Sequence, residues 1–191
     1  MRRSEINRKT NETDISLSLC LDGGEIAVDT GIGFFDHMLE ALARHAGFGL
    51  KLKVTGDLKV DCHHTVEDTG IVLGQALKEA AGDKAGIARY GSSYIPMDEA
   101  LAFTALDISG RGYISFDAEF PDAAVGGMDT CTVIEFMRAF ALNAFVTLHI
   151  KSVYGANSHH IIEAMYKSLA HALKQALVIS SGDILSTKGS L

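Results

Sequence analysis

The sequence has few cysteines, few positive charges and no long apolar run, and each shortage argues against a class of protein. Three of its 191 residues are cysteines, and none has CxxC spacing, which disfavours a disulfide scaffold and a zinc ribbon. Acidic residues outnumber basic ones, 24 to 17, and the net charge of −7 argues against binding to nucleic acid or an acidic membrane surface. No segment approaches the ~20 apolar residues of a membrane span.

The remaining composition indicates an ordinary globular protein of the cytoplasm. The N-terminus, Met1 to Glu5, leads into polar residues, so we expect no signal peptide. Unpaired cysteines fit a reducing cytosol. With 47% hydrophobic residues, the chain can bury a core as one large domain or as two small fused units.

One short pattern occurs twice. Residues 61–68 read DCHHTVED and residues 157–164 read NSHHIIEA, and each copy has a glutamate four residues after the first of two adjacent histidines. Apolar residues at helical spacing follow both copies. We therefore predict that each copy forms the first turn of a helix.

Helical geometry assigns a role to each residue of the pattern. Residues four apart share a face, so the first histidine and the glutamate of one copy can bind one cation. The second histidine points about 100° away and should reach a different ion. Two such helices would form a two-metal site with internal pseudo-symmetry. The residues are His63, His64 and Glu67 in the first copy and His159, His160 and Glu163 in the second.

The order of predicted elements also repeats, as three strands, a helix, a strand and the motif helix. The stretch 50–53 (LKLK) matches 148–151 (LHIK), and the register makes His37 the counterpart of Glu135. Residues 121–129 look like a loop. We predict an α+β protein of two β3-α-β-α halves, 1–86 and 87–191, with apolar helix faces packed together. Chance similarity of two amphipathic units is the alternative.

Candidate ligands can be counted for both ions. The first ion would take His37, His63, Glu67 and His160, and the second would take Glu135, His159, Glu163 and His64. Mixed nitrogen and oxygen ligands with open positions suit Mn²⁺ or Fe²⁺ better than structural zinc, and they imply a catalytic site.

Basic residues beside glycine and serine suggest a phosphate site. Arg89 opens the second half, Arg111 lies between two glycines, and the chain ends LSTKGSL. Arginines in turns are commonly solvated and tails commonly disordered, so this reading stays open. His45, His149 and His171 are read first as ordinary core or surface histidines.

Together the motifs resemble the imidazoleglycerol-phosphate dehydratase family of histidine biosynthesis. They are residues 33–39 (GFFDHML), 61–68, 159–163 (HHIIE) and 186–189 (STKG), and the similarity extends from residues 8–13 (RKTNET) to the end of the chain. The resemblance implies two sheets enclosing a helical layer, a ribosomal protein S5 domain 2-like fold. It also implies two Mn²⁺ ions per active site, at subunit interfaces of a 24-subunit homo-oligomer built from trimers.

The resemblance assigns roles to individual residues. The matched metal ligands are His37, His63, His64, Glu67, His159, His160 and Glu163, and Glu135 stands where relatives often have histidine. Candidate substrate contacts are Glu12, His45, Arg89, Arg111, Lys167, Ser186 and Lys188.

The reaction implied is dehydration of D-erythro-imidazole-glycerol phosphate to imidazole-acetol phosphate. We expect Glu163 to be the base, with Glu67 as the next choice, because both would lie beside the metals and within reach of the substrate. The same ligands could instead serve a two-metal phosphoester hydrolase, or metals could merely hold subunits together.

Overall fold

A computed structural model describes residues 1–180 and 185–186. Each half of the chain forms a four-stranded sheet covered on one face by two helices. The first half contains β1 (Arg3–Lys9), β2 (Thr13–Cys20), β3 (Ile26–Asp29), α1 (Gly33–Ala46), β4 (Gly49–Gly56) and α2 (His63–Ala81). The second contains β5 (Tyr90–Met97), β6 (Ala100–Asp107), β7 (Tyr113–Asp117), β8 (Ala124–Val125), β9 (Met128–Asp129), α3 (Thr132–Ala144), β10 (Thr147–Tyr154) and α4 (Ser158–Ala176).

Both sheets have the same topology. The strand order is β1-β2-β4-β3 in the first and β5-β6-β10-β7 in the second. In each sheet the third strand of the half pairs in parallel with the strand that follows the first helix, and the other pairs are antiparallel. The predicted repeat is therefore present in the backbone.

The first helices of the two halves share one burial pattern. Every buried position of α1 has a buried counterpart on α3 at constant spacing, from Phe34 and Thr132 through Ala46 and Ala144. This register pairs His37 with Glu135, as predicted.

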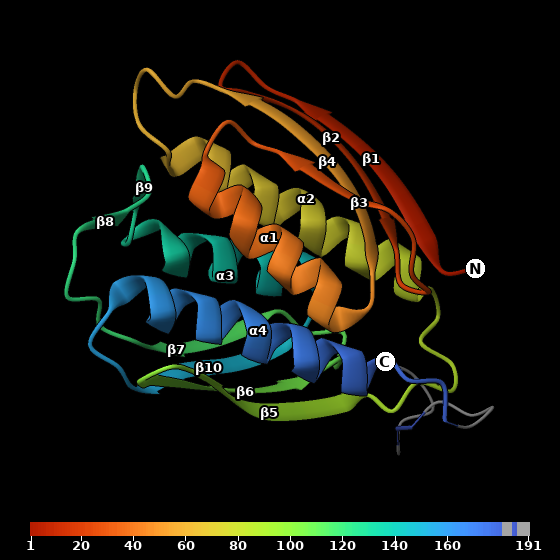
Figure 1. The fold of residues 1–191 in the computed structure, drawn as a ribbon. Helices are drawn as coiled ribbons and strands as arrows, with labels where there is room; N and C mark the ends of the chain where they lie inside the picture. Colours follow the sequence, from red (N-terminus) through yellow and green to blue (C-terminus); the bar gives the residue numbers. More distant parts are fainter. Residues whose placement is uncertain (181–184, 187–191) are drawn as a thin grey trace.

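The helices lie between the two sheets, in the arrangement that the family resemblance implies (Figure 1). They do not pair within their own halves: α1 packs on α4, and α2 packs on α3. Glycine allows the second pair to approach closely, since a Cβ at Gly70 would lie 2.7 Å from the Phe136 carbonyl oxygen. The halves are thus interlocked through their helices.

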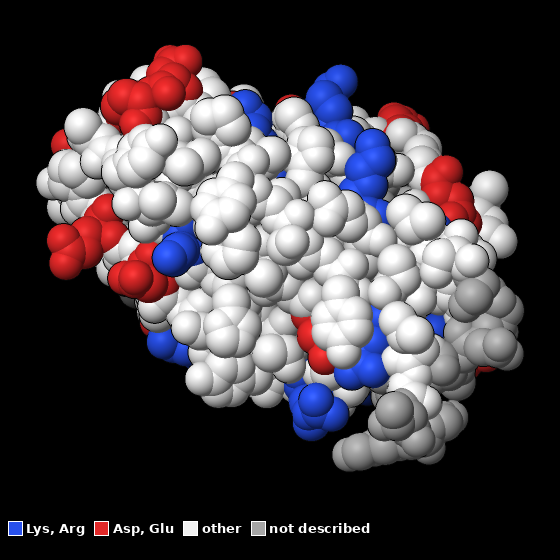
Figure 2. Space-filling model, turned by 90° about the horizontal axis from the view of Figure 1, so that it is seen from below, with Lys and Arg blue, Asp and Glu red and all other residues white. Residues whose placement is uncertain are grey.

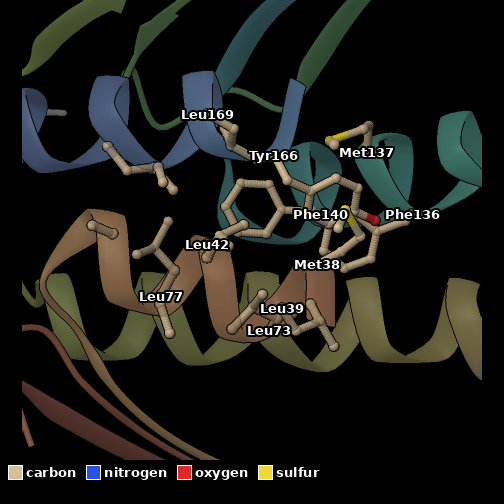
Figure 3. Packing of buried hydrophobic residues seen from close by; sticks show 14 of the residues in the cluster. Met38, Leu39, Leu42, Leu73, Leu77, Phe136, Met137, Phe140, Tyr166 and Leu169 are labelled. Carbon is tan, nitrogen blue, oxygen red and sulfur yellow. The ribbon is translucent and has the colours of Figure 1, made fainter. Parts of the chain in front are cut away.

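Large apolar side chains from all four helices fill the centre (Figure 3). Phe136 on α3 stacks on Tyr166 of α4, with ring centroids 5.2 Å apart, and meets Phe35 of α1 edge-on at 5.5 Å. Leu73 and Leu77 of α2 are buried in the same cluster. Packing of this kind fixes the helices relative to one another, and with them the positions of their first turns.

The stretch 121–129 is more ordered than the sequence suggests. It contains the short β8–β9 hairpin, in which Ala124 pairs with Asp129 and Val125 with Met128. Gly126 and Gly127 form the turn with φ of 53° and 78°, values that favour glycine. Met128 is buried and anchors the hairpin to the core.

The outward faces of the two sheets differ in chemistry. The first presents polar side chains such as Glu5, Ser16 and Lys53 along a shallow hollow. The second is largely uncharged when seen from outside (Figure 2), and it exposes Tyr94 and Tyr113. No helix within residues 1–180 is both long and apolar enough to cross a membrane.

Candidate metal centre

The first turns of all four helices gather at one end of the molecule (Figure 1). His37 lies on α1, His63 on α2, Glu135 on α3 and His159 on α4. Each of these predicted ligands lies in the first turn of its helix. The packing of the helices in the core therefore brings the ligands to the same end of the molecule.

Three of these side chains form a compact donor cluster. His37 Nε2 and His159 Nε2 lie 3.7 and 3.3 Å from the same oxygen, Oε2 of Glu163. One ligand atom from each residue lies within 4.8 Å of the others. Two imidazole nitrogens and a carboxylate oxygen converging in this way are a donor set that suits a divalent transition metal.

Glu163 is held ionised inside this cluster. It is only 5% exposed, and its second oxygen is 2.6 Å from Lys167 Nζ. Burial alone would raise the pKa of Glu163, but the Lys167 ammonium, helped by His37 and His159, brings that pKa below its usual value. The carboxylate is therefore available as a ligand or as a proton acceptor at neutral pH.

The first motif has the predicted helical geometry but is more open. His63 Nε2 lies 3.4 Å from Glu67 Oε2, and about two-fifths of each side chain is exposed. The spacing of four residues thus brings histidine and glutamate together in both motifs, as expected.

The grouping of His37 differs from the prediction. Sequence reasoning assigned it to the ion of His63 and Glu67, whereas the structure places it with His159 and Glu163. The physical reason is the exchange of helix partners, because α1 packs on α4 rather than on α2.

The second histidine of each motif points elsewhere and has its own carboxylate. His64 Nδ1 is 3.0 Å from Asp57, and His160 Nδ1 is 2.6 Å from Glu99. These contacts raise the pKa of both histidines, and hydrogen bonding to His160 lowers the pKa of Glu99 to about 2. A carboxylate on Nδ1 is the usual way to orient a histidine whose Nε2 binds a metal.

Sequence reasoning did not identify Asp57 or Glu99. Glu99 lies in the β5–β6 turn, which corresponds to the β1–β2 turn that carries Glu12. The repeat thus offers one indication of Glu99 in the sequence, its match with Glu12. Asp57 follows β4 and has no such indication in the sequence.

Glu135 is not in the donor cluster found among the described residues. Its carboxylate forms an ion pair with Arg138, three residues further along α3. Its assignment as a ligand stays a prediction.

Three of the candidate substrate contacts lie near the two motifs or along the helix pair α1–α4. Along the α1–α4 side, Lys167 adjoins Glu163, and His45 Nδ1 lies 3.3 Å from Nε2 of His171. Beside the first motif, Glu12 Oε1 lies 3.7 Å from His64 Nε2.

The predicted phosphate residues are only partly assembled. The guanidinium of Arg89 binds Asp107 through contacts of 2.7 and 3.1 Å and donates to the Leu185 carbonyl at 2.6 Å. Arg111 is exposed in the turn before β7, and Ser186 lies within the part of the chain that the structure describes. Lys188 lies outside the described residues.

The fold and the donor cluster together define a duplicated α+β protein with the side chains of a metal-dependent enzyme. Comparison with known proteins specifies the family. The family model of imidazoleglycerol-phosphate dehydratase matches residues 30–173. The enzyme of that name from Methanosarcina barkeri is 57% identical, and that from Acetivibrio thermocellus 55%, over all of this chain and at least 99% of theirs.

Solved structures agree. A crystal structure of imidazoleglycerol-phosphate dehydratase from Staphylococcus aureus matches with a TM-score of 0.86 and 42% identity, over 93% of this chain and 99% of that one. The Pyrococcus furiosus enzyme in complex with (S)-C348 matches with a TM-score of 0.84 and 38% identity, over 97% and 100%. The chain belongs to the imidazoleglycerol-phosphate dehydratase family and is a hydro-lyase.

Proposed function

We propose that this chain dehydrates D-erythro-imidazole-glycerol phosphate to imidazole-acetol phosphate in histidine biosynthesis, with two Mn²⁺ ions in each active site. The observation that carries the proposal is the convergence of His37, His159 and Glu163 in a member of this family. Cytoplasmic location is part of the proposal.

The donor chemistry fits the proposed metals. His37, His159 and Glu163 would hold one ion, and His63 with Glu67 would contribute to the other. Bound Mn²⁺ would supply Lewis acidity to the groups it holds. Further ligands would come from Glu135 and from the two histidines that carboxylates orient, His64 and His160.

The proton step falls to a glutamate. Dehydration removes a proton from one substrate carbon and hydroxide from its neighbour, and the electrons of the C–H bond form the enol that becomes the ketone. Glu163 is the proposed base, because its low pKa keeps it ionised and Lys167 fixes one of its oxygens. Glu67 is the second choice, since it occupies the equivalent position.

The remaining polar residues would bind the substrate. Arg89 and Arg111, with Ser186 and Lys188, offer the guanidinium, hydroxyl and ammonium groups that recognise phosphate. The Arg89 contact to the Leu185 carbonyl supports this grouping, because Leu185 directly precedes Ser186 in the chain. Glu12, His45 and Lys167 are the other proposed contacts.

A homo-oligomer of 24 subunits, with active sites at subunit interfaces, completes the proposal. Two features support association with further copies. In the first motif, within the described chain, only His63 and Glu67 come together as potential metal ligands. The second sheet exposes Tyr94 and Tyr113 on a largely uncharged face. Aromatic side chains on such a face are typical of protein interfaces.

The test is an assay of the purified protein, stripped of metal and reloaded with Mn²⁺. We expect conversion of imidazole-glycerol phosphate to its ketone, absent before reloading and restored by it. Release of inorganic phosphate without ketone would instead support a phosphoester hydrolase. Sedimentation of the same sample reports the assembly state.

A further inference from the structure

A buried polar contact joins the β1–β2 turn to helix α2 beside the first motif. Thr13 Oγ1 donates a hydrogen bond of 2.5 Å to Asp68 Oδ2, and Arg8 Nη1 lies 2.6 Å from the same oxygen. Thr13 is 2% exposed and Asp68 is 8% exposed. A carboxylate removed from water needs such partners, so the contact fixes the turn on the helix.

The position of Asp68 on α2 determines what the contact holds in place. Asp68 follows His64 by four residues, so the two side chains share a face of the helix. The turn that is anchored at Asp68 therefore lies beside His64. Glu12 immediately precedes Thr13 and reaches to 3.7 Å from His64 Nε2.

The turn is closed independently of the helix. Thr10 Oγ1 accepts hydrogen bonds from the backbone N–H groups of Glu12, at 3.1 Å, and Thr13, at 3.0 Å. This is the geometry by which threonine stabilises a turn. The backbone of Glu12 is thus fixed on both sides, while about half of its side chain stays exposed and accessible to a ligand.

Among the described residues, the second half of the chain has no equivalent of this contact. Ala164 occupies the position in the second motif that Asp68 occupies in the first. There the turn residue Glu99 binds His160 directly and accepts hydrogen bonds from the backbone N–H groups of Ala156, at 3.2 Å, and Asn157, at 2.9 Å. Glu99 anchors itself, whereas Glu12 is held by its neighbours and keeps its carboxylate available.

We propose that Asp68, acting through Thr13 and Arg8, is a positioning residue that holds the Glu12 carboxylate beside His64, where it meets the substrate. The inference rests on the proposed function, in which Glu12 is a substrate contact. It adds three residues to the machinery of the site that touch neither metal nor substrate.

The first test compares two substitutions of Thr13. Thr13→Val keeps the shape and removes the hydroxyl, whereas Thr13→Ser keeps the hydroxyl. Because a misplacement of about 1 Å can cost up to about 100-fold in rate, we expect Thr13→Val to lower kcat at least about tenfold and Thr13→Ser to stay within about threefold of the original protein. Asp14→Asn is the matched control, since Asp14 lies in the same hairpin and pairs with exposed Lys9.

Mn²⁺ content and the thermal unfolding midpoint are measured on the same samples. Loss of activity at unchanged metal content, in protein that is still folded at the assay temperature, supports positioning. A Thr13→Val protein that is fully active overturns the proposal, as does one whose metal content or folded fraction at that temperature falls in parallel with its activity. A protein without dehydratase activity before any substitution would instead contradict the proposed function itself.

A double-substitution cycle checks that the effect passes through Glu12. Added to Glu12→Ala, Thr13→Val should change kcat by less than about twofold, because two residues that act as one unit are not additive. Single-turnover measurements with enzyme in excess follow the slow variants. A further tenfold loss, or normal turnover of Glu12→Ala alone, would overturn the proposal.

Discussion

The two motif helices carry the same histidine-histidine-glutamate pattern, but the protein prepares them differently. In the second motif Glu163 is buried, bound to Lys167 and met by His37 from another helix, and the ring of Phe34 packs on His159 with centroids 4.9 Å apart. In the first, Glu67 faces His63 and is far more exposed. The two copies have the same spacing of histidine and glutamate but differ in the residues that surround them. The ligands of the second motif are therefore already brought together within the chain, whereas those of the first are open to solvent.

The largest expected effect tests this difference at the two glutamates. Glu163→Gln should lower kcat by about 10³-fold, within the range that general-base catalysis supplies, while substrate still binds. Glu67→Gln should lower kcat less if Glu163 is the base. Steady-state kinetics with equilibrium substrate binding decide between them. Near-normal turnover of Glu163→Gln would remove it from that role.

The next effect concerns the carboxylates that orient the second histidines. Glu99→Gln and Asp57→Asn should each weaken Mn²⁺ binding by about 10- to 100-fold, the usual effect of losing a residue that orients a metal ligand. Metal titration followed by electron paramagnetic resonance measures this. Glu25→Gln is the control, because Glu25 is exposed and pairs with Lys51 at the surface. Affinities equal to that of the original protein in Glu99→Gln and Asp57→Asn would contradict a role for these two carboxylates in metal binding.

A third effect separates the two helix pairs. Gly70 on α2 is where α3 approaches, and an added Cβ would meet the Phe136 carbonyl oxygen at 2.7 Å and Ala139 Cβ at 3.0 Å. We expect Gly70→Ala to destabilise the protein by about 1–3 kcal/mol, since overpacking outweighs the better helix propensity of alanine. Chemical denaturation measures the loss. Gly82→Ala does not test packing, because Gly82 has a positive φ; Gly33→Ala, in open space, is the control.

The smallest effect lies at the corresponding point of the other pair. Tyr166 on α4 is fully buried, and its hydroxyl has no hydrogen-bond partner among the described residues. Burial raises the pKa of Tyr166 well above its usual value, so the ring stays neutral. Tyr166→Phe should stabilise the protein by about 1 kcal/mol, because it removes a polar group that gains nothing in the core. A clear loss of stability would show that the hydroxyl has a partner.

Local patterns predicted most of the fold, and tertiary packing limited the prediction of the site. The alternation of Ile15, Leu17 and Leu19 identifies a strand, and spacing of four places His159 beside Glu163, because both depend only on neighbouring residues. The partner of His37 depends on which helices pack together, and an apolar helix face does not specify its partner. Asp57 and Glu99 were missed for the same reason, since their histidines contact them only in the folded chain.

The exchange of helices between the halves has a consequence for the origin of the site. Because His37 comes from one half while His159 and Glu163 come from the other, no single half contains the three-donor cluster. An ancestral protein with one such unit could have formed this cluster only by pairing with a second molecule. Gene duplication would then have placed this cluster within a single chain, in which each copy could diverge.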